Sequence, residues 1–169
     1  MSRYRTTCQQ PGKAEGFTLV ELMVTLAVIG ILAVIATPSM TNLISNSRVS
    51  GQTEEIVASL QLARAEAIRR NARVTVCAGA STTCSGSATW SNWIVYGRDK
   101  TSATPNADEN IRDTAVNTSL QVTGPAAGIV FKPSGMIDAQ QTLEITKSSY
   151  QRCVTVLISG VVSVQKGAC

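Results

Sequence analysis

The sequence contains no histidine in 169 residues, and its charged and aromatic residues are few, at 15% and 4%. Without an imidazole, the chain can form no Ser-His-Asp triad, no Cys-His pair and no histidine-containing zinc site. Most familiar hydrolase chemistry is thereby excluded. Hydrophobic residues make up 44% of the chain. This length and composition are typical of one folded domain with an appended segment.

Motifs for other chemistries are also missing. The sequence has no Gly-rich phosphate loop, no nucleophile elbow and no CxxC pair. The polar run DKTSATPNADEN, residues 99–110, lacks the ligand spacing of an EF-hand loop. We therefore expect no catalysis, no bound metal and no cofactor.

Apolar residues are concentrated in one segment, from Phe17 to Ala36. It reads FTLVELMVTLAVIGILAVIA and carries a single charge, that of Glu21. A helix of this length covers about 30 Å, the thickness of the hydrocarbon core of a bilayer. The segment in front of it has three basic residues and one acidic residue, which favours a cytoplasmic N-terminus. The sequence thus predicts one membrane span, over residues 17–37, and an exported remainder.

Two residues distinguish this segment from an ordinary secretory signal or signal anchor. A secretory signal is cut after its apolar region, next to small residues, whereas the small residue Gly16 precedes the run. Glu21 lies inside the run, where a carboxylate costs about 2.5–3.5 kcal/mol. A charge in that position requires a partner.

The sequence GFTLVE, residues 16–21, resembles the class III signal of type IV pilins and type II secretion pseudopilins. The resemblance implies that a prepilin peptidase removes the leader, residues 1–16, by cleaving after Gly16, and that a methyltransferase modifies Phe17. Glu21 would then set the assembly register by pairing with the terminal amine of a neighbouring subunit. The implied locations are the bacterial inner membrane, beside the assembly platform, and then the filament.

An amphipathic helix is expected over residues 38–72. Apolar and small residues recur there at spacings of four and three, from Val49 to Ala67, which is the pattern of a helix that packs one face on a sheet. Pro38 should kink the helix, because it lacks a backbone donor and clashes with the preceding turn. The stretch TNLISNSRVSGQ, residues 41–52, is rich in weak helix formers and should bend or partly melt.

Beyond Arg73 the pattern changes to short alternating strands separated by turns, which predicts an antiparallel sheet over residues 73–169. The expected strands are 73–77, 93–98, 129–132, 143–146, 152–158 and 161–165. Residues 99–110 are polar and turn-rich, so regular structure is not expected there. Together with the helix, these strands give the α+β class.

Removal of residues 1–16 leaves four cysteines, an even number in a compartment where disulfides persist. Three pairings are possible. The shorter loops favour Cys77 with Cys84 and Cys153 with Cys169.

The exported part adds a second resemblance, to the GspH/FimT/FimU branch of minor pilins and pseudopilins. The segment WSNWIVY, residues 90–96, with the acidic turn and outgoing strand at 106–112, is similar to the W-x-x-G-W pattern of that branch, with Asn92 in place of the glycine. IVFKPSG, residues 129–135, looks like its F-x-x-x-G hairpin. The resemblance implies a pilin fold, in which a long kinked helix packs on an antiparallel sheet domain. It also places Trp90, Trp93 and Phe131 in the core.

In proteins of this branch, a minor subunit helps to prime filament assembly at the tip, together with other minor and major pilins. The four paired cysteines and the terminal Cys169 look more like the FimU kind, which favours a type IV pilus. A GspH-like minor pseudopilin of a type II secretion system is the alternative.

DNA capture, as in some FimT-like pilins, is a further alternative. In those proteins a C-terminal G-R-x-R stretch contacts phosphates, but the corresponding residues 160–163 read GVVS here. Four basic residues could still gather on one face of the sheet: Lys132, Lys147, Arg152 and Lys166. The mature chain keeps twelve basic and ten acidic residues, and this small excess weighs against a nucleic-acid partner.

Overall fold

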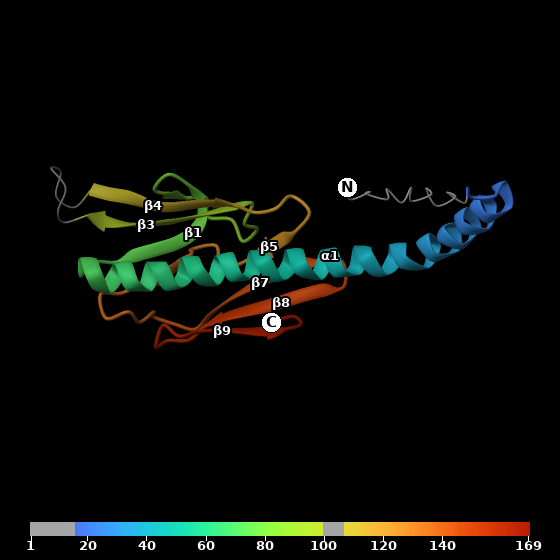
Figure 1. Ribbon diagram of the computed structural model, residues 1–169. Helices are drawn as coiled ribbons and strands as arrows, with labels where there is room; N and C mark the ends of the chain where they lie inside the picture. Colours follow the sequence, from blue (N-terminus) through green and yellow to red (C-terminus); the bar gives the residue numbers. More distant parts are fainter. Residues whose placement is uncertain (1–15, 100–106) are drawn as a thin grey trace, which may run out of the picture. The chain divides into compact units, whose positions relative to one another are not determined.

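The computed structural model describes residues 16–99 and 107–169, without the side chains of residues 35–39, 99 and 107. Contacts within the chain divide it into two units, one ending at Thr41 and the other covering Asn42–Cys169. The described ranges contain one helix and nine strands (Figure 1): α1 (Leu19–Arg70), β1 (Val74–Ala80), β2 (Thr83–Cys84), β3 (Asn92–Asp99), β4 (Ala107–Ala115), β5 (Gln121–Thr123), β6 (Ile129–Phe131), β7 (Gln141–Lys147), β8 (Tyr150–Val156) and β9 (Val162–Lys166).

The helix α1 is continuous over its 52 residues. Residues 41–52 are helical throughout, so the expectation that this segment partly melts is wrong, whereas the expected bend remains a prediction. Packing overrides the weak intrinsic propensity. Val49 is fully buried, and the Gln52 side-chain oxygen accepts a hydrogen bond from the backbone N–H of Asn117 at 2.9 Å. α1 also runs through Pro38, whose side chain lies outside the described residues, and the kink expected there remains a prediction.

The helix ends in a Schellman motif. Asn71 adopts the left-handed conformation, with φ of 46°, which Asn tolerates better than most residues. The backbone N–H groups of Asn71 and Ala72 donate to the carbonyls of Ile68 and Ala67, both at 3.2 Å. α1 therefore stops at Arg70 rather than at Ala72, and the chain turns directly into β1.

Two antiparallel sheets pack on α1. The first has the strand order β2-β1-β3-β4, with β6 also paired to β1, and the second has the order β5-β7-β8-β9. Figure 1 shows β1, β3 and β4 on one side of the second half of α1, and β7, β8 and β9 on the other. The predicted α+β class is confirmed, with two antiparallel sheets where the sequence suggested one.

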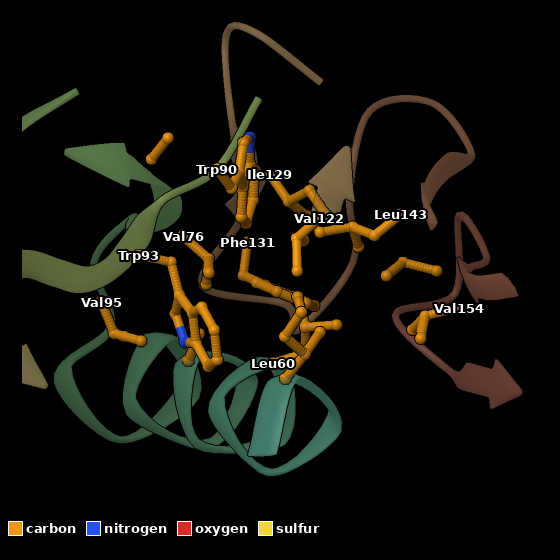
Figure 2. Packing of buried hydrophobic residues seen from close by; sticks show 14 of the residues in the cluster. Leu60, Val76, Trp90, Trp93, Val95, Val122, Ile129, Phe131, Leu143 and Val154 are labelled. Atoms are coloured by element: carbon orange, nitrogen blue, oxygen red, sulfur yellow. The ribbon is translucent and has the colours of Figure 1, made fainter. Parts of the chain in front are cut away.

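The core lies between the two sheets and one face of α1. The helix contributes residues at helical spacing: Val49, Ile56, Leu60, Ala63 and Ala67. Trp90, Trp93 and Phe131 are at most 1% exposed, as the resemblance implied. Figure 2 shows the ring of Trp93 pointing toward α1, where its Nε1–H donates to the Ser59 hydroxyl at 3.0 Å.

All six predicted strands are present, with ends shifted by at most three residues. Periodicity missed the three strands β2, β4 and β5. The expectation that residues 99–110 lack regular structure is wrong at Asp99, which ends β3, and at residues 107–110, which begin β4. Residues 100–106 of that run lie outside the described residues. A polar edge strand does not alternate between apolar and polar residues, so its sequence reads as a loop.

Two disulfides close local loops. Cys77 bonds to Cys84 within the first sheet, and Cys153 bonds to Cys169 beside the second. Their sequence separations are 7 and 16 residues. These are the pairs that the shorter loops favour.

Candidate functional site

The bond between Gly16 and Phe17 lies in exposed chain ahead of the helix. α1 begins at Leu19 because Thr18 caps it. The Thr18 hydroxyl accepts a hydrogen bond from the Glu21 backbone N–H at 3.2 Å, within a Thr-x-x-Glu sequence of the capping-box type. The helix thus starts two residues after the expected first residue, and the Gly16–Phe17 bond is left outside regular structure.

The helix that follows is apolar and uncovered. Each large apolar side chain from Phe17 to Val34 that the structure describes is at least 50% exposed. A helix that is apolar on all sides requires a nonaqueous environment, either lipid or other helices. Among the described residues, no helix is both long and apolar enough to cross a membrane. The span expected over residues 17–37 extends into residues 35–39, whose side chains lie outside the description, and it remains a prediction.

Glu21 is exposed on this apolar helix. Among the residues that the structure describes, neither the five ion pairs nor the side-chain hydrogen bonds include its carboxylate, whereas its backbone N–H is bound by the Thr18 hydroxyl. The nearby Thr25 hydroxyl is satisfied by the Leu22 carbonyl at 2.9 Å, which is the usual solution for a hydroxyl on an apolar helix. Glu21 is therefore an available anionic acceptor in an otherwise apolar helix.

Three of the four expected basic residues lie in or at the end of the second sheet. Arg152 and Lys166 are directly opposite each other on β8 and β9, so their side chains share one face. That face turns toward α1, because the Arg152 guanidinium donates to the Asn46 side-chain oxygen of α1 at 2.9 Å. Lys147 ends β7 on the same sheet. Lys132 instead follows β6 and forms an ion pair with Asp138.

Sequence reasoning missed one basic residue, Arg48 of α1. Its guanidinium donates to the Ser119 hydroxyl at 3.4 Å, across 71 positions of sequence. Lys147 donates to the same hydroxyl at 3.1 Å. The structure thus brings Arg48 and Lys147 together at Ser119, between α1, the loop before β5 and the β7–β8 hairpin, whereas Arg152 contacts Asn46 and Ser50 of α1. No local pattern around Arg48 indicates this position.

The turn that corresponds to the DNA-contacting stretch of FimT-like pilins is apolar here. Gly160 has a φ of 76° and a bonded Cβ would lie 1.9 Å from the Gly135 carbonyl oxygen, so only glycine fits. The following Val161 is 47% exposed. Within the described residues, no group of three or more Cys, Asp or Glu is arranged to hold a metal ion.

A charge network ties the end of α1 to β4. Glu66 accepts hydrogen bonds from Arg69 at 2.7 Å and from Arg70 at 2.6 Å, and Arg70 also reaches Glu109 of β4 at 2.6 Å. The hydrogen bond from Arg69 lowers the pKa of the Glu66 carboxyl; burial opposes this, and Arg70 adds to it. Burial works against the charge of Arg70, but Glu66 and Glu109 raise its pKa.

Comparison with known families gives two matches. The pattern of the family "Type II transport protein GspH" matches residues 52–161. The "Prokaryotic N-terminal methylation motif" matches residues 12–37. A type IV major fimbrial protein, FimA from Dichelobacter nodosus, is 58% identical over 36 residues. That stretch covers 21% of this chain and 23% of the fimbrial protein, so the likeness to this curated relative spans less than a quarter of its length.

Two solved structures share the fold. The type IV minor pilin FimU of Pseudomonas aeruginosa superposes with a TM-score of 0.52 at 18% identity, over 69% of this chain and 91% of that one. The minor pseudopilin EpsH, from the type 2 secretion system of Vibrio cholerae, superposes with a TM-score of 0.52 at 16% identity, over 70% and 97%. At such identities, the likeness establishes the fold alone.

Proposed function

The chain belongs to the GspH family of minor pilins and pseudopilins, and from that membership we propose that it is a minor subunit that helps to prime assembly of a type IV pilus at the tip. The methylation motif and the family imply a membrane-anchored component of a pilus or pseudopilus. The finer proposal is that a prepilin peptidase cleaves after Gly16, that Phe17 is then N-methylated, and that the subunit assembles with other pilins from the inner-membrane platform.

One observation carries the assembly step of this proposal, in which Glu21 sets the register. Glu21 is an acceptor without an ionic partner in the described chain, on a helix whose large apolar side chains are exposed. In an apolar medium, a carboxylate is stabilised by a cationic partner with good hydrogen-bond geometry. Cleavage after Gly16 would create such a cation, the terminal amine of Phe17, in every neighbouring subunit. Pairing of Glu21 with that amine would fix the axial register of the incoming subunit.

The test is incorporation of a Glu21→Gln variant into filaments. Breaking one partner of a buried ion pair costs about 3–5 kcal/mol, so we expect less variant in sheared filaments by a factor of at least about 100, at an unchanged cellular level. Glu54→Gln removes an exposed carboxylate from the other unit of the chain and is the matched control. Recovery of Glu21→Gln at the control level would refute the register role.

A pseudopilin of type II secretion is the second candidate, because EpsH superposes on the chain with the same TM-score as FimU, 0.52. Deletion of the gene separates the two machines. Loss of surface pili and twitching with normal secretion supports the pilus proposal. Loss of secreted proteins with normal pili supports the pseudopilus.

DNA capture is the third candidate, and Arg152 and Lys166 on one sheet face favour it. Two observations weigh against it. Lys132 is engaged with Asp138, and the turn at residues 160–163 presents Val161 where the FimT-like stretch has a basic residue. A salt-dependent shift of double-stranded DNA by the full chain, lost in Arg152→Gln/Lys166→Gln, would support DNA capture. Absence of any shift of DNA at low salt would rule out DNA capture.

A further inference from the structure

Two cations from distant parts of the chain meet at one hydroxyl. Arg48 Nη1 and Lys147 Nζ donate to Ser119 Oγ at 3.4 and 3.1 Å. The same oxygen donates to Asn117 Oδ1 at 2.8 Å, so its single proton is used. Because Arg48 Nη1 and Lys147 Nζ both contact Ser119 Oγ, the two nitrogens are no farther apart than these two distances added together. Two like charges this close repel each other, and an anion between them would offset that repulsion by attracting both.

The described chain supplies no such anion. The described ion pairs use Arg69, Arg70, Arg98 and Lys132, and none uses Arg48 or Lys147. The neighbouring Arg152 is held by neutral groups, the side chains of Asn46 and Ser50. Glu54 and Arg152 line one hollow beside α1, but they form no ion pair among the described residues. The Glu55 carboxylate is connected to this region through Gln52, whose Nε2 donates to it at 2.8 Å and whose Oε1 accepts from the Asn117 backbone N–H at 2.9 Å. Arg48 and Lys147 themselves have no ion-pair partner among the described residues.

A polar hollow of about 440 Å³ is lined by Lys147 and Ser119, and Arg48 reaches its wall through the hydrogen bond to Ser119. Lys147 forms part of its wall. Most of the remaining wall consists of hydroxyl and amide side chains, those of Thr118, Ser119, Gln121, Thr146, Ser148 and Gln151. Hydroxyls and amides can donate to the oxygens of an anion, and Arg and Lys supply its counter-charge. The hollow thus combines the space, the donors and the charge that a phosphate group requires.

We propose that Arg48 and Lys147, which share the Ser119 hydroxyl at this hollow, form a binding site for the phosphate of an anionic phospholipid headgroup. Two cations that converge on one point suit a single compact anion, whereas a DNA duplex is bound by cations that follow its row of phosphates. A phosphate oxygen can take the place of the Ser119 hydroxyl as the shared acceptor and neutralise both charges. The site would hold the exported unit at the bilayer until assembly withdraws the subunit.

The connection to the apolar segment favours lipid over free phosphate. Arg48 follows Ala36 by twelve residues, and a fully extended connection of that length spans at most about 40 Å. Membrane anchoring, on which this inference rests, would thus keep the site near a surface dense in headgroups, at a high effective concentration. A negatively charged bilayer also attracts basic side chains that lie close to it.

The experiment uses the full chain in nanodiscs of phosphatidylcholine, with and without phosphatidylglycerol. Amide hydrogen exchange of residues 117–121 and 147–151 reports contact with the surface. We expect slower exchange when phosphatidylglycerol is present. Arg48→Gln/Lys147→Gln should lower the equilibrium constant for docking on the bilayer by about 30-fold, because each basic residue near an anionic surface contributes about a factor of five. Each variant is compared with itself in the two lipids, which cancels any change in local stability.

The matched control is Arg98→Gln/Lys132→Gln, which removes the same charge from two exposed ion pairs and should keep the lipid difference. Three results would overturn the proposal: no lipid difference in the unaltered chain, a difference that survives Arg48→Gln/Lys147→Gln, or an equal loss in the control. Equal slowing by inorganic phosphate or duplex DNA in phosphatidylcholine discs would also overturn it. If the chain does not stay in the discs, the proposed membrane anchoring is contradicted. If the chain stays in the discs but its exchange does not depend on phosphatidylglycerol, only the proposed phosphate site is contradicted.

Discussion

The hydroxyl of Ser59 serves two buried partners. It donates to the Glu55 carbonyl at 2.9 Å and accepts from Trp93 Nε1 at 3.0 Å. Both Ser59 and Trp93 are completely buried. The other tryptophan differs, because Trp90 Nε1 is buried without a hydrogen-bond partner among the described residues. The chain thus already contains one unsatisfied indole N–H, and Ser59 prevents a second.

Ser59→Ala should destabilise the protein by about 1–3 kcal/mol, because it leaves the buried Trp93 N–H without an acceptor. Urea unfolding of the full chain in detergent, followed by tryptophan fluorescence, measures the loss. Ser47→Ala, at an exposed position of α1, is the control and should change stability by less than about 0.5 kcal/mol. In a Trp93→Phe background, Ser59→Ala should cost less; an equal cost in both backgrounds would contradict the role of this bond.

Thr18 marks the start of α1 through its capping hydrogen bond, which the hydropathy pattern does not show. The apolar run begins at Phe17, so hydropathy places the helix start there, whereas the Thr-x-x-Glu pattern places it after Thr18. The structure follows the cap, with α1 beginning at Leu19. Hydropathy reports which medium a side chain prefers, and it carries no information on which backbone N–H is capped.

At the scale of elements, the Glu66 network joins the last turn of α1 to β4. Arg70 bridges Glu66 and Glu109, and its side chain is only 11% exposed. Arg69 and Arg70 also place positive charge at the helix C-terminus, where the helix dipole favours it. The polar edge strand β4 is therefore held by charge as well as by its ladder to β3.

The stability contributed by this network should depend on pH. The pKa of Glu66 is lowered in the folded state, so its contribution is complete above the unfolded carboxyl pKa of about 4.3 and is lost as pH falls through the lower folded value. The unaltered chain should thus have a higher free energy of unfolding than Glu66→Gln near neutral pH, and this difference should disappear in acid. Urea unfolding across that range measures it.

Glu54→Gln, which changes an exposed carboxylate of α1 outside the network, is the control for general charge effects. A gap between the unaltered chain and Glu66→Gln that stays constant from neutral pH to strong acid would contradict the assignment of the pKa shift to this site.

The elements differ in how well sequence predicts them. The second half of α1 and the strands of the core carry regular apolar periods, and these were found within a few residues. β4 reads ADENIRDTA and lies at a sheet edge, where only its backbone pairing with β3 makes it a strand. β5 has three residues, too few for a period. Backbone pairing between distant segments leaves no trace in local composition.

At the scale of the molecule, no disulfide among the described residues joins the two sheets. Cys77–Cys84 links β1 to β2, and Cys153–Cys169 links β8 to the chain after β9. Cohesion between the sheets rests on the shared core and on α1, which supplies residues such as Val49 and Leu60 to it. The disulfides should therefore stabilise the fold independently of each other.

Removing each disulfide by paired Cys→Ser substitution should cost about 2–4 kcal/mol. The Cys153–Cys169 bond closes the longer loop, with a separation of 16 against 7 residues, and on the chain-entropy model its loss costs about 0.7 kcal/mol more. Because the bonds lie in different sheets, removing both should equal the sum of the two costs within about 0.5 kcal/mol. Urea unfolding of the three variants measures this. A coupling energy above about 1 kcal/mol would contradict independent sheets.

The candidate sites differ in how far apart their residues lie in the sequence, and this decides whether sequence alone can predict them. Gly16, Phe17 and Glu21 lie within six consecutive residues, so a sequence motif is enough to propose them. Arg48 and Ser119 are 71 positions apart, and Arg48 and Lys147 meet only because the β7–β8 hairpin packs beside α1. A site assembled from distant segments becomes visible only after the chain has folded.

The two disulfides pair neighbouring cysteines along the chain, Cys77 with Cys84 and Cys153 with Cys169. A polypeptide emerges from the ribosome and through a membrane with its earlier residues first. With Cys8 in the proposed leader, Cys84 therefore becomes available while Cys77 is its sole predecessor, and Cys153 emerges when that first pair can already be closed. Oxidation in order of emergence gives the native connectivity directly. The maturation of this protein should thus require an oxidant but no disulfide isomerase.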